Sequence, residues 1–438
     1  MSFSHLASLL PPDAHCVVAF SGGLDSTVLL HQLLSWQRQQ PQLRVRALHV
    51  HHGLSPNADR WAAHCQALCQ EWHLACDVLH VQLDAKMQGV EAAAREARYQ
   101  ALRHQLQPGE RLLTAQHLDD QCETLLLALK RGSGPAGLAA MPTQRQLDGF
   151  WHLRPLLHTS REQLEAYAAA HQLRWIEDES NGDSRFDRNF LRLHVLPLLQ
   201  ARWPHFSAAS ARSAALCAEQ EQLLDELLAE QLTELCDPHG ALAFHPLLAA
   251  SEARRHALLR RWIAQQGGAM PSREALKRIT TEVMQSREDA NPCLRFGTFT
   301  LRRYRQRLYW LPPQPSLREY VLTWHIGEAS LRLPDGLGEL RASHEAGEMR
   351  LPTPDEGVTI RFAAHGYYHL QGRAGGREMK KLWQELGVPP WQRERTPLIY
   401  YNQTLIAAPG LFVTREGAAR QGMPAWRAIW LSQQQAHA

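Results

Sequence analysis

The sequence lacks the features that mark membrane and secreted proteins. No run in its 438 residues approaches the roughly 18 uncharged apolar residues of a membrane span. Residues 1–13 lack the basic start and small-residue cleavage site of a secretory signal. The eight cysteines include no C-x-x-C pair and no spacing typical of a disulfide framework. We therefore expect a cytoplasmic protein with reduced thiols and no membrane partner.

Lysine is also scarce, since only five of the 47 basic residues are lysines and the rest are arginines. Arginine offers bidentate phosphate contacts and stacking on bases, whereas a GC-rich genome would give the same bias without any function. The net charge of +3 is too small to decide for a nucleic-acid partner. The length predicts two to four domains.

A short glycine-rich stretch joins an expected strand to an expected helix near residue 22. The apolar run Cys16–Phe20 ends in Ser21-Gly22-Gly23, and an apolar helical pattern resumes at Leu24. Two glycines permit positive φ and remove both Cβ atoms, so that an anion can approach the N–H groups of the helix start. An ordinary strand-to-helix turn is the alternative. The residues expected to hold phosphate are Ser21, Gly22, Gly23, Leu24, Asp25 and Ser26.

Apolar runs alternate with helical patterns from residue 16 to about 200. The expected strands are Cys16–Phe20, Val45–His51, Ala75–Gln82, Arg111–Gln116 and Arg174–Ile176. The expected helices lie near 26–39, 57–71, 91–106, 119–131 and 160–171. Such alternation predicts an α/β fold with a doubly wound parallel sheet and with ligand sites at the carboxyl ends of the strands.

An acidic motif, H-L-D-D-Q-C-E-T, follows the fourth expected strand and begins at His117. Glu123 stands three residues after Asp120 and four after Asp119, so on a helix these carboxylates share one side. Helix capping would explain one or two acids at a helix start, but not three acids with a histidine. Such a cluster could hold Mg²⁺ or bind a cationic amine.

The glycine stretch Ser21–Ser26 resembles the S-G-G-x-D-S loop of the ATP pyrophosphatase superfamily, whose members cleave ATP to AMP and pyrophosphate through an adenylated substrate. Six further strings lie in order between His51 and Arg192: HHGL, H-x-D-D-Q-x-E-T, R-G-S-G-x-x-G-L, RPLL, D-E-S-N and RNFLR. Together they resemble the tRNA(Ile)-lysidine synthetase family in its long bacterial form. The resemblance covers the whole N-terminal domain.

This resemblance implies a fold like that of the adenine-nucleotide alpha hydrolases and a ligase that uses ATP and Mg²⁺. The implied partners are the isoleucine tRNA with a CAU anticodon and free L-lysine. O2 of the wobble cytidine would attack the α-phosphate of ATP, and the ε-amine of lysine would then displace AMP from C2 to give lysidine. A homodimer is compatible with the sequence.

The resemblance also implies roles for individual residues. The glycine loop would hold the pyrophosphate, Asp25 would coordinate Mg²⁺ or orient the base, and adenine would meet the backbone near His49 and His51. The implied catalytic residues are Asp25, Arg95, Asp119, Asp120, Glu123 and Arg188. The implied substrate-binding residues are His117, Arg131, Asn181, Asn189, Arg192, Arg377, Lys380 and Lys381.

Proline-containing segments and composition shifts divide the chain into three expected domains. Residues 1–204 form the catalytic domain, 205–315 a mainly helical tRNA-contacting domain, and 316–438 an α+β tRNA-binding domain. Arginine-rich strands with interleaved aromatics over 294–311 could face RNA, although solvated strand faces are the alternative. Near Gly372–Trp383, four cations stand close to a helix start after a glycine loop, which indicates an anion site.

Three other functions share part of this pattern. A tRNA thiolase would share the loop and the nucleic-acid partner, but usually needs a C-x-x-C pair or a catalytic cysteine, for which Cys122 is the one candidate. An amide-forming ligase would leave the arginine-rich second half without a role. A pure RNA-binding module would bind tRNA without consuming ATP.

Overall fold

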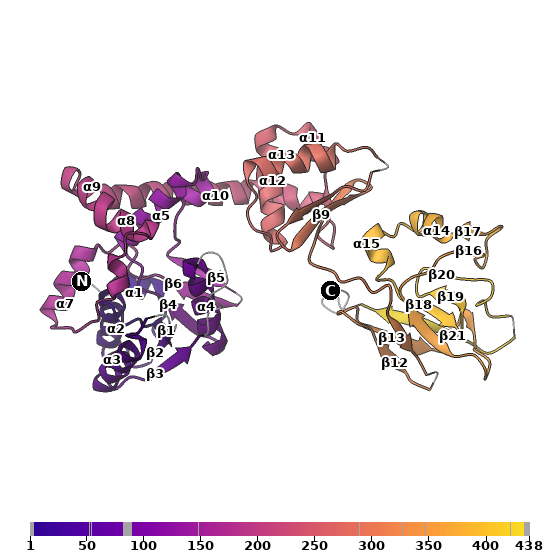
Figure 1. Ribbon diagram of the computed structural model, residues 1–438, viewed down its shortest axis with the longest axis horizontal. Helices are drawn as coiled ribbons and strands as arrows, with labels where there is room; N and C mark the ends of the chain where they lie inside the picture. Colours follow the sequence, from indigo (N-terminus) through magenta and orange to yellow (C-terminus); the bar gives the residue numbers. More distant parts are fainter. Residues whose placement is uncertain are drawn as a thin grey trace. The chain divides into compact units, whose positions relative to one another are not determined.

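The computed structural model describes residues 4–51, 53, 55–81, 90–147, 149–288, 290–325, 327–345, 347–420 and 422–432. It comprises two compact units, Met1–Leu227 and Leu228–Ala438, whose boundary falls inside helix α10 (Phe206–Leu235; Figure 1). No helix among the described residues is long and apolar enough to cross a membrane. The three-domain division expected from the sequence stays a prediction.

A single six-stranded sheet forms the centre of the first unit, with the strand order β3-β2-β1-β4-β6-β5. Neighbouring strands pair in parallel except β5, which runs antiparallel to β6. The strands are β1 (His15–Ala19), β2 (Arg44–His51), β3 (Cys76–His80), β4 (Glu110–Leu113), β5 (Gln144–Leu147) and β6 (Phe150–Leu153). The expected doubly wound parallel sheet is confirmed.

The expected strand at Arg174–Ile176 is wrong, because β6 takes the fifth parallel position. Residues 174–176 instead run beside the glycine loop, where the Ile176 N–H donates to the Gly22 carbonyl at 2.8 Å. β6 escaped notice because it is short and carries a polar side chain, His152, at a buried position.

Helices cover both faces of this sheet, as the alternation of side chains along β1 requires. Cys16 and Val18 pack in the core formed with α2 (Leu24–Gln37), α3 (Ala58–Glu71) and α7 (Arg161–Ala170). Val17 points the other way and packs against Leu102 of α4 (Val90–Gln105) and against Leu106, which directly follows that helix. Figure 1 shows α2 and α3 on one side of the sheet and α4 on the other.

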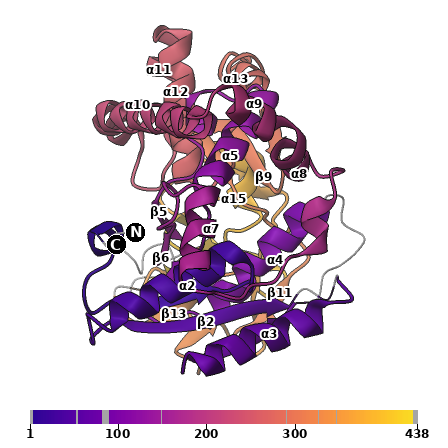
Figure 2. The same ribbon diagram turned by 90° about the vertical axis from the view of Figure 1, so that its left-hand side faces the viewer.

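The remaining elements of the first unit gather after β4 and β6. Figure 2 shows α5, α8 and α9 at one end of this unit, with α3 at the opposite end. These elements are α5 (Leu118–Lys130), α6 (Pro135–Leu138), the 3-10 turn η1 (Glu179–Gly182), α8 (Asp187–Phe190), the π-helical turn η2 (Leu191–Val195) and α9 (Leu196–Arg202), whereas α1 (Ser4–Leu9) precedes β1.

In the second unit, residues 242–311 form a four-stranded antiparallel sheet packed on helices. The sheet has the order β7-β10-β9-β8, and Trp262 and Trp310 lie in its core. Arg303 is buried, and its guanidinium donates to the Ser286 carbonyl at 2.8 Å, so this arginine supports the fold. The elements are β7 (Leu242–Ala243), α11 (His245–Ala249), α12 (Glu252–Gln265), α13 (Arg273–Arg278), η3 (Ile279–Met284), β8 (Cys293–Phe296), β9 (Phe299–Tyr304) and β10 (Arg307–Leu311).

Residues 321–431 contain short antiparallel strands around two short helices. The two larger sheets have the orders β11-β15-β18-β19-β20 and β12-β13-β21-β14, while β16 pairs with β17. The strands are β11 (Val321–Thr323), β12 (Ser330–Arg332), β13 (Glu339–Ser343), β14 (Met349–Arg350), β15 (Val358–Arg361), β16 (Tyr367–Tyr368), β17 (Arg377–Glu378), β18 (Leu398–Tyr401), β19 (Thr404–Ala408), β20 (Phe412–Val413) and β21 (Ala425–Leu431). The helices are α14 (Met379–Glu385) and α15 (Pro390–Arg393).

Replacing Gly22 by alanine tests the packing of the glycine loop. Gly22 has φ +82°, and a Cβ there would lie 2.8 Å from both Cys65 Sγ and Ile176 Cδ1. Gly109 is the matched control, because it has φ +85° but no neighbour within 4 Å. We expect Gly109→Ala to cost about 1–2 kcal/mol of unfolding free energy for its φ alone, and Gly22→Ala to cost more. Equal losses in urea unfolding would contradict this packing.

The pair Arg350–Glu356 makes stability depend on pH. Two guanidinium nitrogens of Arg350 donate to the two Glu356 oxygens, each at 2.6 Å, and these bonds lower the Glu356 pKa to about 2. A depressed pKa stabilises the fold above the ordinary value of 4.5 and loses that effect as pH falls toward 2.

Glu356→Gln should therefore lower the unfolding free energy by about 1–3 kcal/mol at pH 7. The difference from the wild type should shrink between pH 4.5 and 2. Urea unfolding of the full chain at several pH values measures this. Glu339→Gln, which breaks the more exposed pair Arg341–Glu339, should cost under about 1 kcal/mol. A loss at Glu356 that does not vary with pH would refute the linkage.

Candidate active site

A cavity of about 810 Å³ lies at the carboxyl ends of the parallel strands. That volume is at the upper end of the range for small-molecule sites. Ten residues expected at the site line it: Ser21, Asp25, Ser26, His49, His51, Asp120, Asn181, Arg188, Asn189 and Arg192. Side chains that the sequence reasoning did not assign to the site also line it, among them Trp61, Arg98, Tyr99, Gln116 and Phe186.

The glycine loop connects β1 to α2, and its residues Ser21, Asp25 and Ser26 line this cavity. Gly22, with its positive φ, reverses the chain, and Gly23 precedes α2 without any side-chain cap. The N–H groups in the first turn of a helix have no partner within the helix, so those of Leu24, Asp25 and Ser26 can bind an anion. The hydroxyls of Ser21 and Ser26 lie 3.0 Å apart at the mouth of the loop.

Two histidines from the end of β2 line another wall. His49 Nδ1 lies 2.9 Å from the Phe20 carbonyl, which can only accept, so Nδ1 carries the proton. Burial lowers the pKa of His49, so this imidazole is neutral near pH 7. His51 Nε2 lies 2.9 Å from Asp59 Oδ1, at the rim.

His117 caps α5 and joins the glycine loop to the acidic motif. Its Nδ1 accepts from the Asp119 N–H at 3.3 Å, and its own backbone N–H donates to Asp120 Oδ2 at 3.0 Å. Because Nδ1 accepts, the ring proton is on Nε2, which faces Asp120 Oδ2 at 3.5 Å and Asp25 Oδ2 at 3.8 Å. His117 is thus buried between the two halves of the site.

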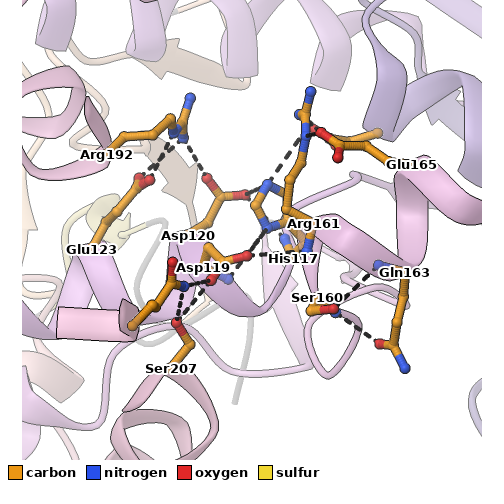
Figure 3. Close-up of polar contacts among 12 residues, drawn as sticks. His117, Asp119, Asp120, Glu123, Ser160, Arg161, Gln163, Glu165, Arg192 and Ser207 are labelled. Atoms are coloured by element: carbon orange, nitrogen blue, oxygen red, sulfur yellow. Dashed lines mark hydrogen bonds and ion pairs between the residues drawn. The ribbon is translucent and has the colours of Figure 1, made fainter. Parts of the chain in front are cut away.

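Arg192 bridges two acids of the motif (Figure 3). Its Nε donates to Glu123 Oε1 at 2.8 Å and its Nη2 to Asp120 Oδ1 at 3.0 Å. Arg188 Nη1 lies 3.6 Å from Glu123 Oε2. Glu123 is fully buried, and burial raises the pKa of its carboxyl while Arg192 opposes the rise. Arg192 lies in a π-helical turn, a feature frequent at functional sites.

Asp119 makes a different set of contacts from those of Asp120 (Figure 3). Its Oδ1 accepts from Ser207 Oγ at 2.8 Å and from Gln200 Nε2 at 3.0 Å. Its Oδ2 accepts from the Arg161 backbone N–H at 3.1 Å. Asp119 is not among the lining residues, and it joins the starts of α7 and α10 to α5.

Arg161 is a site residue that the sequence analysis missed. It is the first residue of α7, and its Nη1 donates to Asp25 Oδ1 at 3.1 Å. Only the expected helix at 160–171 could have drawn attention to it, because no motif includes it.

The carboxylate of Asp25 could be one of several ligands of a metal ion. Burial raises its pKa above the ordinary value, although His117 and Arg161 act in the opposite direction. Among the described residues, no three or more His, Cys, Asp or Glu side chains could hold a metal by themselves. Mg²⁺ is usually bound by one or two carboxylates together with substrate phosphates and water. Asp25, which lines the cavity at the start of α2, fits such a set as one carboxylate.

The other expected residues fall into three groups. Asn181 and Asn189 line the cavity, whereas Arg131 is exposed at the end of α5. Arg95 lies in α4, but its side chain is outside those that the structure describes. The expected residues of the second unit are Arg377, which lies 3.4 Å from Glu385, and the exposed Lys380 and Lys381.

Comparisons with known proteins match nearly the whole chain. Models of three families match: a PP-loop domain over residues 3–199, a TilS substrate binding domain over 242–309 and a TilS substrate C-terminal domain over 358–430. Solved structures with similar parts include the U34-tRNA thiolase NcsA from Methanococcus maripaludis, with TM-score 0.41, 16% identity and coverage of 48% of this chain and 75% of its own. A TILS C-terminal domain matches with TM-score 0.19 and 20% identity, over 24% of this chain and 92% of its own.

Two curated relatives are similar along almost their full length. A tRNA(Ile)-lysidine synthase of Serratia proteamaculans is 60% identical over 427 residues, which cover 98% of each chain. Another, from Escherichia coli O157:H7, is 57% identical over 403 residues, which cover 92% of this chain and 93% of the relative. On this identity and coverage, the chain belongs to the tRNA(Ile)-lysidine synthase family.

Proposed function

We propose that this chain ligates free lysine to C2 of the wobble cytidine in the CAU-anticodon isoleucine tRNA, with ATP as the activating substrate. Cytosine C2 carries no usable leaving group, so the base is first adenylated on O2 with release of pyrophosphate. The lysine ε-amine then displaces AMP. A tRNA substrate is consistent with a cytoplasmic location.

The observation that carries the proposal is one cavity lined both by residues of an anion-binding loop and by Asp120 of the acidic motif. Ser21, Asp25 and Ser26 line it beside Asp120 and Arg192. An adenylation and an amine attack on the same base need a phosphate site and an ammonium site within reach of each other. The 3.8 Å between Asp25 and His117, and the 3.5 Å between His117 and Asp120, support that proximity.

For the nucleotide, we assign the glycine loop to the pyrophosphate and the end of β2, near His49 and His51, to adenine. Asp25 would hold Mg²⁺ with the phosphates, where the ion would neutralise phosphate charge. Arg188 and Arg192, which line the cavity, are suited to bind phosphate oxygens. Arg161 would then be free to leave Asp25, since its side chain is half exposed.

For the amine, we assign Asp120 as the carboxylate that contacts lysine, because it lines the cavity and Glu123 does not. Asp120 could also accept a proton from the attacking amine. Glu123, fully buried on Arg192, would position that guanidinium. Asp119 would act on the fold between α5, α7 and α10 rather than on lysine.

A tRNA thiolase is the closest alternative function. The properties of Cys122, its candidate catalytic cysteine, argue against it. Cys122 is fully buried in α5, and burial raises the pKa of its thiol. A catalytic cysteine needs an accessible thiolate. Cys122 is also absent from the residues that line the cavity.

The direct test is product analysis with the isoleucine tRNA, labelled ATP and labelled lysine. The proposal predicts equal amounts of AMP, pyrophosphate and lysine incorporated into tRNA. Incorporation of sulfur from a sulfur donor, or tRNA binding without ATP consumption, would refute it.

Exchanging Asp120 for asparagine should weaken lysine binding. Loss of the negative charge should raise KM for lysine on the order of 10- to 100-fold, while adenylation of the tRNA persists. Asp119→Asn is the matched control: it should lower stability with little effect on KM for lysine, because Asp119 contacts Ser207 and Gln200 instead. Steady-state kinetics with unchanged KM and turnover for Asp120→Asn would rule out this assignment.

Removing two exposed lysines should weaken tRNA binding. Arg373 and Arg377 already pair with Glu385, whereas Lys380 and Lys381 of α14 are exposed and form no ion pair among the described residues. Phosphate contacts release counterions, so the double alanine variant should reduce the slope of log affinity against log salt by about one to two. Filter binding across a salt series measures this, and an unchanged slope would return the loop to a structural role.

A further inference from the structure

A buried chain of hydrogen bonds ends on Gln116, and the proposed reaction assigns no role to the residues of this chain. Gln116 lies between β4 and α5 and lines the cavity. Behind it stand Thr114, His152 and Arg154, which are 6%, 1% and 4% exposed. Thr114 is fixed in place because its N–H donates to the Leu153 carbonyl at 3.0 Å.

The direction of this chain follows from its buried end. A guanidinium can only donate, so Arg154 Nη2 donates to His152 Nδ1, 3.3 Å away. His152 Nδ1 therefore carries no proton, and the ring proton is on Nε2, which donates to Thr114 Oγ1 at 2.7 Å. Thr114 has one proton left to give, and it donates that proton to Gln116 Oε1.

This order fixes the orientation of the Gln116 amide relative to Thr114. Its oxygen is committed to Thr114, so its NH₂ group is left as a donor for a ligand. A buried, fully directed network of this kind holds one arrangement because reversing any member would oppose two donors or two acceptors. Gln116, which lines the cavity after β4, therefore has its NH₂ group available as a donor of fixed orientation.

We propose that Gln116 is a specificity residue that reads the reacting base by donating to N3 of cytosine. The assignment rests on the proposed function, because it takes the wobble cytidine as the second ligand of the cavity. Cytosine N3 is an acceptor next to the reacting C2 and O2, whereas uracil carries an N–H at the same position. The amide N–H can therefore donate to N3 of cytosine, whereas in uracil it would face another N–H donor.

The position of Gln116 favours the base over the nucleotide. In the sheet, β4 lies beside β1 on the side opposite β2, and the adenine assignment uses the end of β2. Gln116 directly precedes His117, whose Nε2 lies 3.5 Å from Asp120, the proposed lysine contact. Gln116 and the proposed lysine contact Asp120 thus both line the cavity on the segment that follows β4.

The experiment compares tRNA-dependent release of pyrophosphate for two isoleucine tRNA transcripts, with C or U at the wobble position. Gln116→Glu is nearly isosteric and turns the donor into an acceptor. We expect the C-to-U ratio of kcat/KM to fall on the order of 10- to 100-fold, with KM for ATP unchanged. Gln116→Ala should also lower the ratio. Thr114→Val should lower it less, because it removes only the hydroxyl that orients the Gln116 amide.

Gln146→Glu, on the exposed face of β5 and outside the cavity, is the matched control and should leave the ratio unchanged. Thermal unfolding of each variant checks that it folds. An unchanged ratio in folded Gln116→Glu and Gln116→Ala overturns the inference, and so does a raised KM for ATP with an unchanged ratio. A wild-type chain that fails on the C transcript with ATP and lysine would instead refute the proposed function.

Discussion

Parallel pairing of β1 with β4 is the constraint on which the candidate site depends. Val18 lies opposite Leu113 in the register of these strands, so both strands end at the same edge of the sheet. The loop after β1 supplies the helix start that can bind phosphate, and the loop after β4 supplies His117 and the acids of α5. The sheet therefore brings a helix start that can bind phosphate and an acidic cluster together, although about 90 residues separate them in the sequence.

Compensation of charge is the second feature of the site. Burial raises the pKa of both Asp25 and Glu123. His117 and Arg161 oppose the rise at Asp25, and Arg192 opposes it at Glu123. Asp25 and Asp120 face the cavity and can accept further positive charge, which in the proposed reaction comes from Mg²⁺ and the lysine ammonium group. Arg192 lines the cavity and contacts both Asp120 and the buried Glu123.

The sequence predicted those parts of the fold and site that depend on local pattern. The alternation of apolar runs and helical periods predicted β1 to β4, and the S-G-G-L-D-S string predicted the phosphate loop. β6 was missed because a buried histidine interrupts its apolar character, and that histidine proves to belong to the network behind Gln116. Arg161 and Gln116 were missed because their roles depend on tertiary contacts with Asp25 and Thr114. The spacing of Asp119 and Glu123 predicted a common side, but only the structure reveals that Asp119 contacts Ser207 and Gln200 and does not line the cavity.

The central claim is that the cytidine, and not lysine, receives the adenylate in this cavity. Exchange of labelled pyrophosphate into ATP tests it most directly, because exchange reports reversible formation of the adenylate. The account predicts exchange that requires the isoleucine tRNA, proceeds without lysine and is lost in Asp25→Asn. Exchange that requires lysine and proceeds without tRNA would contradict it.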